Sequence, residues 1–181
     1  MTGRADETLA FIRELPRGEV RGRFVIADAA LAAAERLLPT FRSSDADHEG
    51  MLFLLGWEFD ALTVFTAALA PDADHGRGHV ICEAGGVSAA QRAARQHGLA
   101  LLGQLHSHPR ASTQHSEGDD TLVLLPFEGM LSLVAPWYGR GGLRPLPGLG
   151  VHQFQDGRWV LMTPDSVRER FTVAPTAIDL R

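Results

Sequence analysis

Hydrophobic and polar positions occur along the chain in blocks whose period changes several times. Apolar runs rich in β-branched or aromatic residues at 23–27, 49–59 and 61–70 predict three strands. Between the first two, the run AALAAAERLLPTF predicts a helix over 29–41, with Asp28 as its N-cap. The first part of the chain is therefore predicted to form a strand, a helix and two further strands.

The rest of the chain continues this alternation. Further strands are predicted at 79–84, 99–108 and 130–137, with a hairpin around Asp156–Gly157 at 151–162. Further helices are predicted at Glu7–Leu15, between Ser88 and Gly98, at the start of 119–126, and at 164–171, before a frayed tail. Because strands and helices alternate without a regular βαβ rhythm, the pattern predicts one α/β domain with a mixed sheet.

Length and composition place the chain among ordinary globular proteins. Its 181 residues suit one domain with a short N-terminal appendage, and 45% of them are hydrophobic. No apolar run approaches a membrane span and the N-terminus lacks the layout of a signal peptide, so we expect a cytoplasmic protein without a membrane partner. The net charge of -5, without a basic stripe, argues against nucleic acid as a partner.

Cysteine content limits the chemistry that the chain can carry. Cys82 is the only cysteine, which excludes an internal disulfide and a thiolate zinc cluster. Any metal site must therefore be built from His, Asp and Glu.

A candidate metal site lies in the stretch HSHPRASTQHSEGDD. His106 and His108 are two residues apart at the end of a predicted strand, so their imidazoles share one face of the sheet. A loop after Pro109 could bring Asp119 back toward them. Two histidines and one carboxylate would leave a fourth tetrahedral position open, as in catalytic zinc sites. A His-x-His pair alone is more often a solvated surface pair at a strand end.

The complete stretch is more specific than the histidine pair. His-Ser-His-Pro, followed after six residues by Ser-x-x-Asp, resembles the signature of the JAMM/MPN+ (JAB) zinc metalloproteases. The resemblance implies a single JAB/MPN domain, with a mixed, mostly antiparallel sheet flanked by helices and a cytidine-deaminase-like fold. We expect this domain at 23–172, after an N-terminal arm or cap at 1–22 and before a C-terminal tail at 173–181.

The resemblance also implies the roles of individual residues. His106, His108 and Asp119 would bind one catalytic Zn²⁺, and Ser116 would stabilise the oxyanion. An upstream glutamate would accept a proton from the attacking water.

The glutamate is identified from a pattern like Glu-x-x-Gly-x-x-x-Gly. Glu49 lies seven residues before Gly56, but the inner glycine is displaced to Gly50 and Leu52 stands in its usual place. We therefore expect a change in local packing rather than in chemistry. Glu83 is the alternative, although its neighbours indicate a turn.

Several nearby residues have plainer interpretations. Ser107 points to the opposite face and is interpreted as structural. His115 and His48 are interpreted as solvated loop histidines, with a place behind the metal ligands as the alternative. Asp120 is an alternative ligand that the spacing disfavours.

The resemblance implies a substrate class. Such enzymes cleave isopeptide or peptide bonds after the C-terminal residues of a ubiquitin-like protein, whose tail would add as a strand in an edge-strand groove. The chain lacks lysine and extra Cys and His ligands, and is similar to the bacterial, deubiquitinase-like branch. Partners would include E1-like and E2-like enzymes, in a conjugation pathway linked to phage defence. The Gly- and Pro-rich segment 138–150 would be a flap that orders on binding, or a plain surface loop.

Two alternative functions remain. One is a main-chain peptidase that processes a sulfur-carrier protein. The other is a non-catalytic MPN scaffold, against which the complete ligand set argues.

Overall fold

The computed structural model describes residues 20–41, 46–121 and 126–176. The predicted helix Glu7–Leu15 and the last five residues of the chain lie outside this described part.

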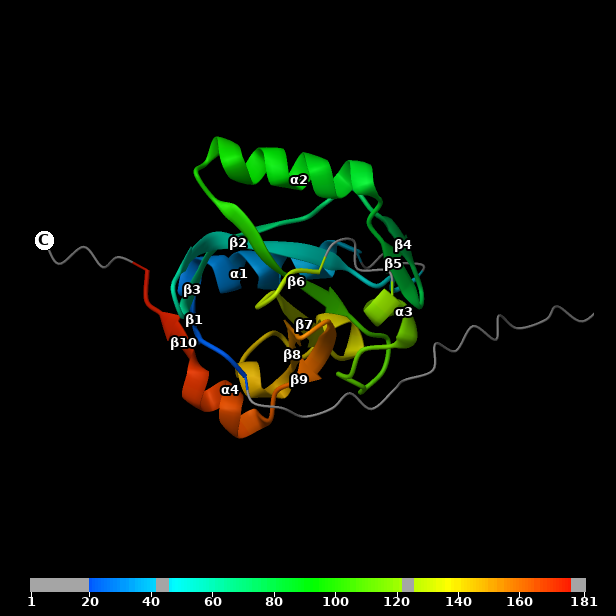
Figure 1. Cartoon of the computed structure of the whole chain (residues 1–181). Coiled ribbons are helices and arrows are strands. Elements are labelled where there is room, and N and C mark those ends of the chain that lie inside the picture. The colour runs from blue at the N-terminus through cyan, green and yellow to red at the C-terminus, as the bar shows by residue number, and fades with distance from the viewer. Residues whose placement is uncertain (1–19, 42–45, 122–125, 177–181) are drawn as a thin grey trace, which may run out of the picture.

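An eight-stranded mixed sheet forms the centre of the domain (Figure 1). Its order is β10-β1-β3-β2-β6-β7-β8-β9. β1 is parallel to β10 and β3, and β6 is parallel to β7, whereas the other neighbours are antiparallel. The strands are β1 (Arg23–Ala27), β2 (Met51–Phe59), β3 (Leu62–Leu69), β6 (Ala100–Ser107), β7 (Leu131–Ala135), β8 (Gly150–Gln155), β9 (Arg158–Leu161) and β10 (Phe171–Ala174). A separate ribbon pairs β4 (Asp74–Gly76) with β5 (His79–Ile81). The prediction of an α/β fold with a mixed sheet is confirmed.

Helices cover both faces of the sheet. Side chains along β2 point alternately to the two faces, and each face packs against its own helix. Leu52 and Leu54 join the larger core with residues of α1, whereas Phe53 and Leu55 join a second core with Ala90 and Ala94 of α2. Figure 1 shows α2 lying across the sheet, apart from α1. The helices are α1 (Asp28–Leu37), α2 (Ala84–Gln96), α3 (Glu117–Thr121) and α4 (Pro164–Arg170), with 3₁₀ turns η1 (Leu38–Phe41), η2 (Trp137–Gly139) and η3 (Leu146–Gly148).

Two predicted helix starts are wrong. Asp28 is the first residue of α1 rather than its cap, and the cap position is occupied by Ala27. α2 begins at Ala84, four residues before the predicted start at Ser88, and its first turn contains Gly85 and Gly86. A Cβ on Gly86 would lie 2.4 Å from the carbonyl oxygen of Asp72. Gly86 therefore allows close packing of the helix against Asp72, and the two glycines do not prevent the helix from beginning at Ala84.

The segment 138–150, for which the sequence leaves a flap or a plain surface loop open, is anchored to the domain at several points. Arg144 forms ion pairs with Asp28 at 2.7 Å and with Glu35 at 3.4 Å. Three leucines of the segment are buried in the larger core: Leu143, Leu146 and Leu149. Apolar anchors spaced along a Gly- and Pro-rich segment hold it against the domain.

The predicted frayed tail is also wrong for residues 172–174, and Phe171, predicted at the end of a helix, belongs to the same strand. These residues form β10, which pairs in parallel with β1. The rings of Phe24 and Phe171 stack with centroids 4.7 Å apart. The partner of this short strand lies at the other end of the described chain, so the local sequence does not reveal the pairing.

Candidate metal centre

The register between β2 and β6 brings two distant parts of the sequence together. Met51 lies opposite His106 in this antiparallel pair. The pairing continues one step further, because Ser107 N–H donates to the carbonyl of Gly50 (3.0 Å) and Gly50 N–H donates to Ser107 Oγ (2.9 Å). Glu49 therefore falls across from His108, on the face that carries His106.

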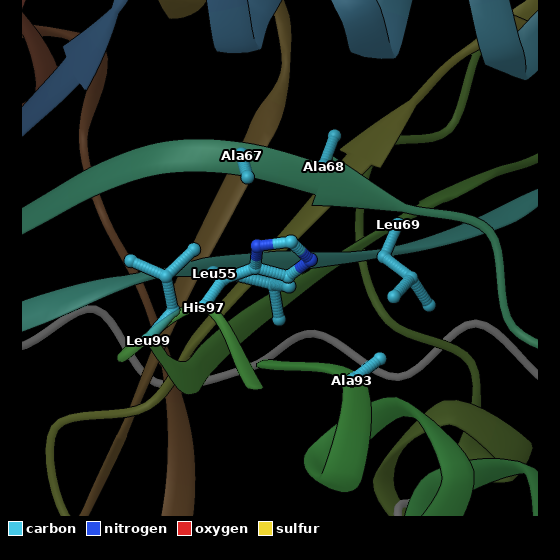
Figure 2. Close-up of a pocket in the computed structure, with 7 residues that line it drawn as sticks. All are labelled: Leu55, Ala67, Ala68, Leu69, Ala93, His97 and Leu99. Carbon is cyan, nitrogen blue, oxygen red and sulfur yellow. The ribbon is translucent and has the colours of Figure 1, made fainter. Parts of the chain in front are cut away.

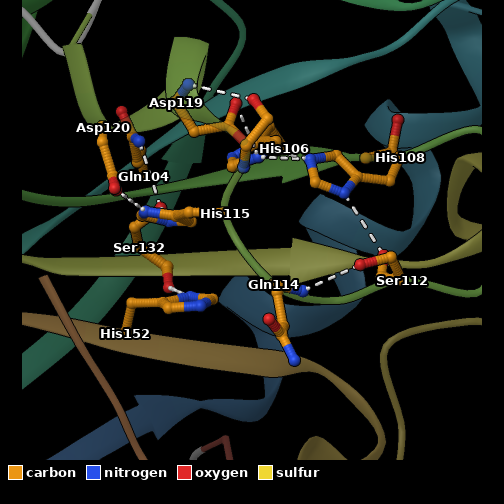
Figure 3. Close-up of polar contacts among 12 residues, drawn as sticks. Gln104, His106, His108, Ser112, Gln114, His115, Asp119, Asp120, Ser132 and His152 are labelled. Carbon is orange, nitrogen blue, oxygen red and sulfur yellow. Dashed lines mark hydrogen bonds and ion pairs between the residues drawn. The ribbon is translucent and has the colours of Figure 1, made fainter. Parts of the chain in front are cut away.

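His106, His108 and Asp119 converge (Figure 3). The two imidazole Nε2 atoms are 3.2 Å apart, His106 Nε2 is 3.3 Å from Asp119 Oδ1, and His108 Nε2 is 3.1 Å from Asp119 Oδ2. Two ligand atoms about 2.0–2.1 Å from a tetrahedral zinc ion are separated by ~3.3 Å. The spacing and the chemistry of these donors therefore fit zinc.

Local hydrogen bonds orient the ligands. His108 Nδ1–H donates to the carbonyl of Ser112 (3.2 Å), which leaves the Nε2 lone pair for a metal. Ser116 N–H donates to Asp119 Oδ2 (2.7 Å), while Asp119 N–H donates to Ser116 Oγ (3.1 Å). This reciprocal pair is a capping box at the start of α3. The Ser-x-x-Asp spacing thus has a structural cause as well as a chemical one.

Asp119 is ionised in this environment. Burial alone would raise its pKa, but the charges and hydrogen bonds of His106 and His108 hold the pKa well below its ordinary value. The carboxylate is therefore available as a ligand at neutral pH.

Glu49 has the burial and pKa of a proton carrier. Its side chain is 6% exposed, and burial raises its pKa to about 7, with a lowering effect from His108 and a raising effect from Asp119. Its backbone is fixed, because Glu49 N–H donates to Gly76 and His75 Nδ1–H donates to the Glu49 carbonyl, both at 2.8 Å. Glu83, the alternative, is exposed at the residue before α2. A carboxyl that titrates near neutral pH suits general acid–base work.

The raised pKa of Glu49 predicts a pH-dependent stability. The folded-state pKa of about 7 lies above the unfolded value of 4.5, so ionising Glu49 destabilises the fold as the pH rises between these values. In metal-free protein, Glu49→Gln should raise the free energy of unfolding at pH 8 by about 3 kcal/mol, but by less than about 1 kcal/mol at pH 5. Urea unfolding of both proteins in chelator measures this. An equal difference at both pH values would contradict the shift, and Glu83→Gln is the exposed control.

His115 is buried beneath this group, which corrects its interpretation as a solvated loop histidine. Its side chain is 0% exposed, with Nδ1 3.0 Å from Asp120 Oδ1 and Nε2 2.9 Å from Ser132 Oγ. Burial, with a further effect from His106, lowers its pKa to about 3, so the ring is neutral. The order Asp–His–Ser is that of a hydrolase triad. Ser132 is also fully buried, however, so no substrate reaches its hydroxyl.

The support for His115 comes from a polar row across three strands. Gln104 of β6 pairs with Ser132 of β7, which pairs with His152 of β8. The ring of His115 stacks on that of His152, with centroids 3.8 Å apart. The sequence signal for this row is a polar residue within each of three neighbouring strands, and β6 and β8 hold further polar residues beside it.

The structure does not bring the remaining histidines into the ligand group. Asp120 is turned toward His115 and lies outside the group as well. Leu52, at the place of the displaced glycine, is buried in the larger core. A separate apolar hollow of about 400 Å³ lies between α2 and strands β2 and β3 (Figure 2), lined by Leu55, Ala67, Ala68, Leu69, Ala93, His97 and Leu99.

Comparisons with known proteins agree with this architecture. A sequence model of the family described as prokaryotic homologs of the JAB domain matches residues 31–143. The solution structure of protein DSY2949 from Desulfitobacterium hafniense superposes with a TM-score of 0.59 at 15% identity, covering 84% of this chain and 94% of that one. No curated protein sequence matches the chain. Among the described residues, no helix is long and apolar enough to cross a membrane.

Proposed function

Because the chain belongs to the family of prokaryotic JAB domains, we propose that it is a zinc-dependent peptidase of the JAMM type. The observation that carries the proposal is the convergence of His106, His108 and Asp119 opposite a buried carboxyl, Glu49. A scaffold without catalysis would need neither this donor set nor a glutamate whose pKa is raised to about 7.

The residues divide the chemistry among them. His106, His108 and Asp119 would hold zinc, which when bound supplies a Lewis acid and lowers the pKa of water. Glu49 accepts the proton of the attacking water and later delivers it to the departing amine. Burial of Glu49 raises its pKa to about 7 in the metal-free site, and this burial favours a carboxyl that can both take up and release a proton.

Ser116 is proposed to stabilise the oxyanion. Its Oγ already accepts the Asp119 N–H, and a hydroxyl that accepts one hydrogen bond retains its own proton for donation. The same side chain caps α3 and helps to place Asp119.

Ser116→Ala should therefore reduce both turnover and metal affinity. We expect kcat to fall by about 10²–10³-fold from the lost oxyanion donor. We also expect weaker zinc binding, because the capping box that places Asp119 is broken. Steady-state kinetics at saturating zinc and a chelator competition separate the two effects. Kinetics close to those of the wild type would remove Ser116 from the mechanism.

We propose a ubiquitin-like protein or its conjugates as the substrate. The resemblance of the HSHP and Ser-x-x-Asp pattern to JAMM enzymes supports cleavage after the C-terminal residues of such a protein, in deconjugation or precursor maturation. E1-like and E2-like enzymes would then be partners in a bacterial conjugation pathway, for which we propose a link to phage defence. An extended tail would add as a strand in an edge-strand groove near the metal ligands.

Two substrates with the same ubiquitin-like protein test the proposal. One joins its C-terminus to a reporter through a main-chain bond, and the other joins it to a lysine side chain. The zinc-loaded protein should cleave at least one of them, lose activity in chelator and regain it with zinc. Cleavage of the main-chain fusion alone would favour processing of the sulfur-carrier type. Zinc binding without cleavage of either would favour a scaffold.

A further inference from the structure

We propose that His115 is a positioning residue for the metal centre, holding the first turn of α3 so that Asp119 reaches the two histidine ligands. The proposal rests on the proposed function only as far as metal binding. Its evidence is the buried hydrogen-bond chain through Gln104, Ser132, His115 and Asp120 (Figure 3).

The donors and acceptors of this chain have one consistent direction. A carboxylate only accepts, so the hydrogen on the His115 ring lies on Nδ1 and is donated to Asp120 (3.0 Å). His115 Nε2 then accepts the hydroxyl proton of Ser132 (2.9 Å), whose oxygen accepts from Gln104 Nε2 (3.1 Å). The strand residues Gln104 and Ser132 thereby fix the ring and its tautomer.

The chain reaches the metal ligand through the short helix α3. Asp120 follows Asp119 directly, and its backbone N–H donates to the carbonyl of Ser116 (3.2 Å). A single helical turn does not hold its own geometry without further contacts. The Ser116–Asp119 capping box fixes one side of its first turn, and the His115–Asp120 hydrogen bond fixes the other.

Packing alone does not explain a histidine at this position. Beside its ring, His152 Nε2 and Trp159 Nε1 are buried without a hydrogen-bond partner among the described residues. Each such atom costs about 1–3 kcal/mol, so this buried cluster of polar rings is not the arrangement that stability alone would favour. Buried polar groups that lower stability are expected where residues contribute to the functional site rather than to the fold.

Two substitutions of His115 separate its hydrogen bonds from its volume. His115→Phe fills the space but loses both bonds, whereas His115→Asn places an amide N–H where Nδ1 was and keeps the bond to Asp120. We expect His115→Phe to bind zinc about 10–100-fold more weakly than wild type and His115→Asn to recover most of that loss. Zinc affinity is measured by chelator competition, and the Co²⁺ absorption spectrum reports ligand geometry. His97→Phe, at an exposed histidine at the end of α2, is the control.

Zinc and Co²⁺ binding by the variants decides the proposal, with no measurement of catalytic activity. If His115→Phe does not fold, Ser132→Ala breaks the same chain at its next bond and should also weaken zinc binding. Variants that bind zinc and Co²⁺ as the wild type does would overturn the positioning role, even if urea unfolding shows them to be less stable. A wild-type protein that binds no zinc would overturn this proposal and the proposed function together, whereas equal binding by all variants overturns this proposal alone.

Discussion

Glu49→Gln is expected to reduce the rate of peptide-bond cleavage by about 10²–10⁴-fold while one zinc ion stays bound per chain. Glutamine keeps the volume and the buried position of Glu49 but cannot accept a proton from water. Glu49 lies two residues before Met51, which pairs with His106, and does not belong to the ligand group, so its loss should leave the three donors in place.

Elemental analysis and cleavage kinetics on the same preparation measure this result. Glu83→Gln is the matched control, because Glu83 is exposed and should be replaceable without effect. Undiminished turnover would show that another group carries the proton. Loss of zinc together with turnover would instead give Glu49 a role in holding the metal.

Removing one of the ligands, unlike Glu49→Gln, is expected to abolish zinc binding. His106→Ala or Asp119→Ala should lose zinc as well as activity, because each leaves only two donors of a set whose atoms lie within 4.8 Å of one another. The drop in affinity should exceed the about 10–100-fold that follows loss of a residue behind the ligands.

Zinc content after gel filtration, together with the Co²⁺ spectrum, checks this prediction. His79→Ala replaces an exposed histidine and should retain the ion. If His106→Ala or Asp119→Ala retained a full complement of zinc, that residue would not be a ligand.

The ligand candidates could be predicted because they lie in one continuous stretch. His106 and His108 alternate on a strand, and Asp119 returns through a loop of fixed length, so the local spacing carries the geometry. Glu49 followed only from the family resemblance. The structure supplies the physical reason for its position, since the register of β2 against β6 sets it opposite His108.

The surroundings of His115 could not be predicted because they depend on pairing between strands that are distant in sequence. The neighbouring residues are polar and indicate an exposed loop. Burial follows from Gln104, Ser132 and His152, whose alignment is visible only when β6, β7 and β8 are side by side. A polar residue in an apolar strand is a weak signal until its cross-strand neighbours are known.

The accuracy of the predicted strand and helix boundaries has a similar explanation. Strands β1, β2 and β3 were predicted within two residues because their apolar runs are strong. The start of α2 was missed because glycine lowers helix propensity, while here the close approach of Asp72 excludes a larger residue at Gly86. Tertiary packing outweighed local preference at that helix end.

The parallel pairing of β1 with β10 has a consequence for the order of folding during translation. β1 is among the first described segments to leave the ribosome, and β10 is among the last. Until then one edge of β1 presents unpaired backbone groups and the ring of Phe24 lacks its partner Phe171. Contacts of such large sequence separation form slowly. The nascent chain therefore carries an open edge on β1 while all the other strands of the sheet emerge, and this edge closes only when β10 arrives.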